Sequence, residues 1–92
     1  MADDPHDPFL PYAIAQEHTA AGLWEEAIPE FSALIERFPE YLPTYYQYSV
    51  ALVKTDRLPL AIDILQRGLG LARRYKDFKT AGEIEALLED LD

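Results

Sequence analysis

The chain has 92 residues, 49% of them hydrophobic, and a net charge of −9. This length allows one domain with one core, without a separate catalytic or regulatory module. The absence of cysteine excludes disulfide bonds, thiolate zinc sites and a cysteine nucleophile. The acidic N-terminus lacks the features of a signal peptide, and no apolar run reaches the roughly 20 residues of a membrane span. We therefore expect a cytoplasmic protein with no membrane partner.

Charge is distributed unevenly along the chain. Residues 1–40 hold nine acidic side chains and one basic one, and residues 83–92 add five acidic ones. Such a surface repels nucleic acid, so we expect no nucleic-acid partner. A basic stretch between these regions either docks an acidic partner or lies near a helix C-terminus, where the helix dipole favours cations. Its members are Arg67, Arg73, Arg74, Lys76 and Lys79.

The first expected helix follows a short acidic arm. We expect residues 1–6 to be mobile and the single domain to span residues 7–92. Asp7 is a good N-cap, and Pro8 suits the first helical position, where its missing N–H costs nothing. The helix should run to about Ala20, and Gly22 should end it in the left-handed conformation that most residues avoid.

The second expected helix covers residues 24–38. Its apolar residues recur at intervals of three and four, which places them on one face of a helix. Pro29 falls inside this pattern and cannot donate a hydrogen bond to the carbonyl of Glu25, so we expect a local kink. Pro39 should end the helix. The apolar face consists of Trp24, Ala27, Ile28, Phe31, Leu34, Ile35 and Phe38.

Two further helices are expected in the middle of the chain. The third spans about residues 43–55, a turn follows at residues 56–57, and the fourth spans about residues 59–75. Gly68 and Gly70 fall inside the fourth helix, where each costs about 1 kcal/mol relative to alanine. We therefore expect another helix to pack closely at both glycines.

The last expected helix, about residues 77–91, is amphipathic, and Asp77 should cap its N-terminus. Its apolar stripe should cover the face that the preceding hairpin leaves exposed, as terminal caps do in repeat proteins. The stripe consists of Phe78, Ala81, Ile84, Leu88 and Leu91.

The sequence repeats itself with a period of 34 residues. Small residues correspond to small ones, and large apolar residues correspond to large ones. One unit of structure therefore occurs twice. The corresponding pairs are Tyr12 and Tyr46, Ile14 and Tyr48, Ala15 and Ser49, Trp24 and Leu58, Ala27 and Ala61, Ile28 and Ile62, and Phe31 and Leu65.

This repeat resembles the tetratricopeptide repeat (TPR) family. The stretch from Gly22 to Phe31 matches the family's G-x-[YW]-E-E-A-I-x-x-F core, and Pro39 stands at the place of its closing proline. The second copy is weaker, because Asp56 replaces the glycine and Leu58 the aromatic residue. The resemblance implies an all-α fold with two antiparallel helix-turn-helix hairpins and a capping helix, in a short right-handed superhelix. Repeat 1 would cover residues 8–41 and repeat 2 residues 42–75.

In this family the first helices of the hairpins line a concave groove that holds peptides or partner helices. The positions implied here are unusually aromatic and apolar for a solvent-facing surface, which is typical of an interface. Alternatively, the two tyrosines among them pack against each other or under the capping helix. The implied groove residues are Phe9, Tyr12, Gln16, Thr19, Pro43, Tyr46, Val50, Val53 and Lys54.

One use of the family is the binding of chaperone C-terminal tails through a clamp of lysine, asparagine and arginine side chains. The corresponding residues here lack the cations, and one carries the opposite charge. A carboxylate needs charge-assisted donors, so we expect no chaperone-tail clamp. The five positions are Tyr12, Gln16, Gln47, Asp77 and Ala81.

No catalytic or metal-binding constellation is evident. His18 is expected to pack between helices, and His6 lies in the acidic arm without matching metal ligands elsewhere. Adjacent acids such as Glu25 and Glu26 point about 100° apart on a helix and cannot converge on a substrate. We therefore expect no enzyme activity, no metal and no cofactor.

Three functional hypotheses remain open. The first is a non-catalytic adaptor or scaffold that binds a partner peptide or helix in the aromatic groove. The second is a structural unit that associates with itself, for example as a homodimer, because two repeats fall short of the three that solenoids usually need. The third is a docking or regulatory subunit of a larger complex that uses the basic stretch. The sequence does not name the partner or the process.

Overall fold

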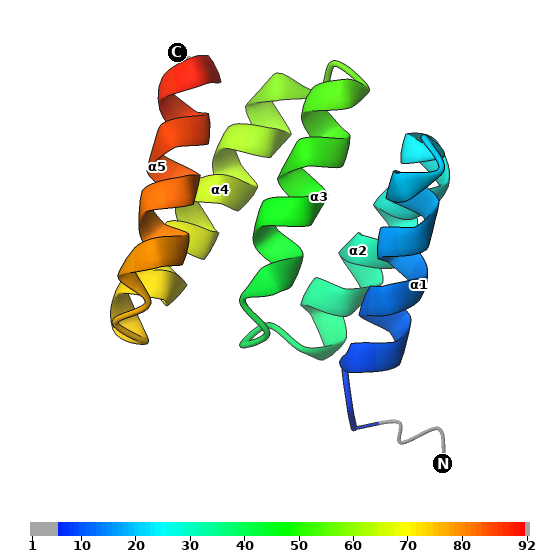
Figure 1. The fold of residues 1–92 in the computed structure, drawn as a ribbon, viewed down its shortest axis with the longest axis horizontal. Helices are drawn as coiled ribbons and strands as arrows, with labels where there is room; N and C mark the ends of the chain where they lie inside the picture. The colour runs from blue at the N-terminus through cyan, green and yellow to red at the C-terminus, as the bar shows by residue number, and fades with distance from the viewer. Residues whose placement is uncertain (1–5, 92) are drawn as a thin grey trace.

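Five α-helices follow one another in the computed structural model, which describes residues 6–91. They form two antiparallel hairpins and a final helix, and Figure 1 shows α1, α3 and α5 in front of α2 and α4. Consecutive helices pack on one another along the chain. The described residues contain no β-strand, so the predicted all-α architecture is confirmed. The helices are α1 (Phe9–Ala20), α2 (Trp24–Arg37), α3 (Pro43–Lys54), α4 (Leu58–Arg74) and α5 (Phe78–Leu91).

The turns of the two hairpins have the same backbone geometry. Gly22 in the first turn and Asp56 in the second both adopt positive φ angles, 78° and 62°. The next residue in each turn donates its N–H to the carbonyl five residues earlier, at 2.8 Å in both cases. This hydrogen bond satisfies a carbonyl that the helix end would otherwise leave without a donor. The 34-residue period thus extends to the backbone of the turns.

The helices α2 and α4 differ in length because of one proline. Pro39 follows the last turn of α2, which ends at Arg37. The equivalent position in the second repeat is Arg73, whose N–H allows α4 to continue to Arg74. Pro29 lies inside α2, which the structure describes as one helix, and the kink expected there stays a prediction.

Aromatic rings join the two hairpins at the centre of the core. The Phe31 ring of α2 is fully buried, with the Tyr12 ring of α1 at 6.3 Å and the Tyr48 ring of α3 at 6.2 Å between centroids. Such tilted arrangements add stabilisation beyond the burial of area. Leu65, the repeat equivalent of Phe31, is also fully buried. The correspondence thus holds in the core for this pair and for Ala27 and Ala61, whereas Ile14 is exposed and its equivalent Tyr48 is buried.

The two glycines of α4 have different environments. A Cβ at Gly68 would lie 2.7 Å from the Cβ of Tyr45 and 3.3 Å from Cδ1 of Ile84. The glycine thus allows α3 and α5 to approach α4 at the same point, as expected from sequence. At Gly70 a Cβ would have no neighbour within 4 Å. The expectation of close packing at Gly70 was wrong, because that residue faces away from both neighbouring helices.

Aspartates precede the first and last helices. Asp7 Oδ1 accepts the N–H of Phe9 at 2.9 Å, although the helix begins at Phe9, one residue after the predicted Pro8. Asp77 Oδ1 accepts the N–H of Thr80 at 3.1 Å, which satisfies one of the free donors at the start of α5. Of the acidic arm expected over residues 1–6, only His6 lies within the described residues.

The final helix packs on α4 through part of its predicted stripe. Ala81 and Ile84 are buried, and Leu88 and Leu91 are partly buried. Phe78, which the stripe also included, is 70% exposed. The prediction for Phe78 was wrong, because it stands at the first turn of α5, beyond the surface that α4 covers.

Candidate functional site

An open pocket of about 230 Å³ is lined by residues of α1, of the start of α3 and of the start of α5. The three helices that contribute to it form the layer nearest the viewer in Figure 1. Its volume is below the roughly 300–1,000 Å³ of most small-molecule sites. The pocket therefore suits a side chain better than a cofactor. Its lining consists of Tyr12, Leu42, Pro43, Tyr46, Gln47, Asp77, Thr80 and Glu83.

Apolar side chains from α1 and the start of α3 form one part of the lining. Tyr12 is buried, and its ring meets that of Tyr41 edge to face at 5.4 Å between centroids. Burial, with a smaller effect of Tyr41, raises the pKa of Tyr12 to about 12. Leu42 is buried, and Tyr46, four residues later in the chain, is half-buried. Tyr12 thus supports the pocket from the core, while Tyr46 remains accessible.

Polar side chains of α5 form the opposite part. The Asp77 carboxylate accepts the backbone N–H of Thr80 at 3.1 Å and its hydroxyl at 2.8 Å. These two hydrogen bonds, with that from the backbone dominant, lower the pKa of Asp77 below its ordinary value. Glu83 is exposed and, within residues 6–91, makes no hydrogen bond or ion pair. This part of the pocket is therefore acidic.

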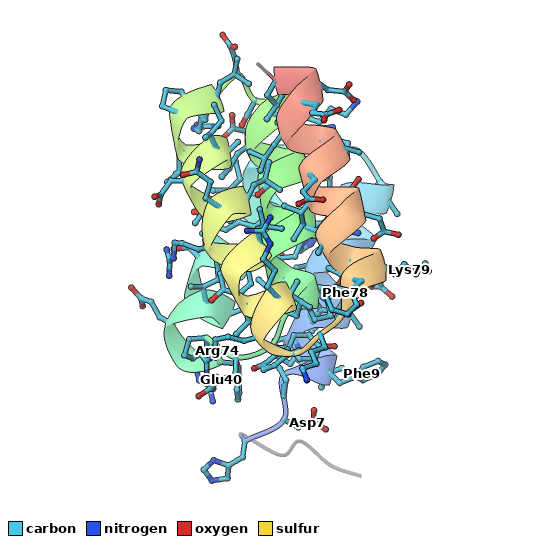
Figure 2. The ribbon with its side chains drawn as sticks, turned by 90° about the vertical axis from the view of Figure 1, so that its left-hand side faces the viewer. Asp7, Phe9, Glu40, Arg74, Phe78 and Lys79 are labelled. Atoms are coloured by element: carbon cyan, nitrogen blue, oxygen red, sulfur yellow. The ribbon has the colours of Figure 1, made fainter. Side chains whose placement is uncertain are left out.

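Two exposed phenylalanines lie on the same side of the molecule as the pocket. Phe9 begins α1 and is 63% exposed, and Phe78 begins α5 and is 70% exposed. Figure 2 shows both on the side where α1 and α5 lie, together with Lys79. They are the most exposed large hydrophobic side chains in the described part of the chain. Their first-turn positions leave them without a neighbouring helix to cover them.

The structure places three of the sequence-derived groove residues, Tyr12, Pro43 and Tyr46, in the pocket lining. The others lie elsewhere on α1 and α3. The Thr19 hydroxyl donates to the carbonyl of Gln16 at 2.8 Å, and the Lys54 ammonium lies 5.8 Å from the centroid of the Trp24 ring. Val50 and Val53 are half-buried along α3.

The basic stretch is divided among several contacts. The Arg67 guanidinium lies 5.8 Å from the centroid of the Tyr45 ring, and Arg73 pairs with Glu85 at 2.8 Å. Arg74, Lys76 and Lys79 are exposed and form no ion pair with another described residue. Figure 2 shows Arg74 and Lys79 toward opposite sides of the molecule, so the stretch is not one compact patch.

The histidine expected between helices joins α1 to α2. His18 Nδ1 lies 2.7 Å from Glu30 Oε1, and both side chains are about one-third exposed. Within residues 6–91, no group of three or more potential ligands gathers in a way that could hold a metal ion. No helix in that same range is long and apolar enough to span a membrane.

Comparisons with known proteins identify the family. No protein-family model and no curated protein matches the chain. Two solved structures of a tetratricopeptide repeat domain protein from Salinibacter ruber do match, each at 33% identity. The solution NMR structure has a TM-score of 0.88 and covers 98% of this chain and 91% of its own. The crystal structure has a TM-score of 0.87 and covers 92% and 94%. The chain belongs to the tetratricopeptide repeat family.

In this TPR domain, sequence reasoning considered Gln47 and Asp77 only as positions of a chaperone-tail clamp, and it did not assign Thr80 or Glu83 to the groove. Asp77, Thr80 and Glu83 recur at intervals of three, so they follow one face of the helix, apart from its buried stripe. This polar periodicity was a readable signal. It was missed because α5 was treated only as a cap over α4.

Proposed function

We propose that this TPR domain is a non-catalytic interaction module, which binds a segment of a partner protein in the pocket between α1, α3 and α5. The observation that carries the proposal is an aromatic pocket with two largely exposed phenylalanines, Phe9 and Phe78, on the same side. Clustered exposed apolar residues on a soluble domain are typical of a binding surface. An apolar anchor residue of the partner would occupy the pocket beside Tyr46.

The chemistry of the lining supports binding rather than catalysis. Both oxygens of Asp77 accept hydrogen bonds from Thr80, so this carboxylate acts as a helix cap. The hydroxyl of Thr80 donates to this carboxylate as part of the same cap, and the lining contains no histidine, lysine or cysteine. The two carboxylates of the pocket would also repel the C-terminal carboxylate of a chaperone tail.

The proposal is tested by capture of partners from a lysate of the source cells. The test variant combines Tyr46→Ala with Phe78→Ala, because these side chains are accessible and their loss leaves the core intact. Leu60→Ala is the matched control, since Leu60 is exposed on α4, outside the pocket lining. We expect a foreign protein that wild type and the control retain and the test variant loses. Equal retention by a folded test variant would refute the pocket as the binding surface.

Self-association is a second candidate, favoured by the outer face of α1. Leu10 and Ile14 lie four residues apart on that helix and are 50% and 43% exposed. A second copy that covered them would bury apolar area. This candidate requires a melting temperature that rises with protein concentration and loses that dependence in Ile14→Asp. A docking role for the basic stretch has weaker support, since Arg67 and Arg73 already have partners within the domain.

A further inference from the structure

The pocket of the proposed function carries charge of one sign. Two of its eight lining residues, Asp77 and Glu83, are acidic, and none is lysine or arginine. The Asp77 carboxylate is held by Thr80, whereas Glu83 is exposed and has no hydrogen bond or ion pair among residues 6–91. An accessible carboxylate next to apolar rings is a ready partner for a cation.

The basic residue nearest to Glu83 in the sequence does not neutralise it. Lys79 precedes Glu83 by one helical turn and lies beside α5 in Figure 2, but the two form no ion pair. A lysine N-terminal to a glutamate at this spacing is the less favourable order for pairing. Lys79 also lies near Asp77, whose carboxyl pKa it helps to lower. Glu83 therefore remains available to a group from outside.

We infer that the partner segment carries a lysine or arginine next to an aromatic or branched aliphatic residue. The apolar residue would enter between Pro43 and Tyr46, and the cation would reach Glu83. This inference rests on the proposed function and adds the chemical class of the partner.

Two physical effects favour such a segment over a neutral or acidic one. A charge-assisted hydrogen bond to a carboxylate is about twice as strong as a neutral one, and arginine can form two in parallel. The net charge of −9 attracts a cationic segment at longer range and repels an acidic one.

The test uses three blocked synthetic peptides with the same central Leu-Trp pair, flanked on both sides by arginine, glutamine or glutamate. Each is titrated into the isotope-labelled domain, and amide shifts in α3 and α5 report binding at the pocket. We expect the arginine peptide to bind about tenfold more tightly than the glutamine peptide at low salt, and to lose this advantage as salt rises.

Two variants assign the preference to Glu83. In Glu83→Gln the arginine and glutamine peptides should bind alike, whereas Glu89→Gln should retain the preference. Glu89 is a matched control, because it is an exposed glutamate of the same helix outside the pocket lining. Both substitutions are at exposed positions, and circular dichroism would verify the fold.

The outcomes separate this inference from the proposed function. Equal binding of all three peptides at the pocket would overturn the cationic partner and leave the pocket as a binding site. Tighter binding of the glutamate peptide would do the same. If no peptide shifts the pocket amides, the inference fails, and the capture experiment with the Tyr46 and Phe78 variant still decides the proposed function independently.

Discussion

The first helices of the two repeats, α1 and α3, occupy equivalent positions but differ in burial. Helix α1 buries only Tyr12 and Ala15, whereas six residues of α3 are buried. Ile14 is 43% exposed and its repeat equivalent Tyr48 is 6% exposed. The cause is the number of neighbours, because α3 lies between α2 and α4 while α1 packs mainly on α2. In a repeat fold, the stack therefore decides whether an apolar position becomes core or surface.

The largest expected effect on stability concerns one pair of equivalent positions, Ile14 in α1 and Tyr48 in α3. Tyr48→Ala removes a buried ring in contact with Phe31, and we expect it to lower the free energy of unfolding by about 3 kcal/mol. Ile14→Ala should cost less than about 1 kcal/mol, because its side chain is already partly in water. Urea denaturation measures both. Similar losses would mean that α1 has a covering neighbour in solution.

An intermediate effect concerns Tyr12, the large buried side chain of α1. Its pKa is about 12 in the folded state and 10.0 unperturbed, so above pH 10 the unfolded state loses its proton more readily. Stability should therefore be unaffected by this group below pH 10 and should fall as pH rises from 10 to 12. Thermal melts of wild type and Tyr12→Phe across this range provide the measurement.

The Tyr12→Phe variant should show a smaller alkaline loss of stability than wild type. Some loss should remain, since burial also raises the pKa of Tyr45. If the two proteins lose stability in parallel, Tyr12 titrates in solution as a free tyrosine does, and α1 is not firmly packed at this point.

The smallest effect compares the two hairpin turns. Gly22→Ala places a side chain at a φ of 78° and should destabilise the domain by about 1 kcal/mol. Asp56→Gly relieves the same constraint at a φ of 62° and should be neutral or stabilising by up to about 1 kcal/mol. Thermal melts measure both variants. If Asp56→Gly lowered the melting temperature as Gly22→Ala does, the two turns would not be energetically equivalent.

Sequence reasoning predicted the helix ends closely, because these depend on nearby residues, and it identified buried pairs such as Phe31 and Leu65. Gly22 ends α1 through its own backbone, and Pro39 ends α2 by lacking an N–H. The expectation for Gly70 failed because it lies about 200° around α4 from Gly68 and faces away from both neighbouring helices. The prediction for Phe78 failed because periodicity assigns a face of a helix without showing how far the neighbouring helix extends along it.

The sequence alone therefore determined the helices, the turns and the twofold repeat of this TPR domain. Each depends on propensities and on contacts within a few turns of helix, which the spacing of residues encodes directly. The tertiary structure decided that Tyr12 lies in the core while Tyr46 stays accessible, and that Asp77, which caps α5, and Glu83 within α5 line the same pocket. That arrangement depends on how α1, α3 and α5 approach one another, and no local pattern in the chain specifies this.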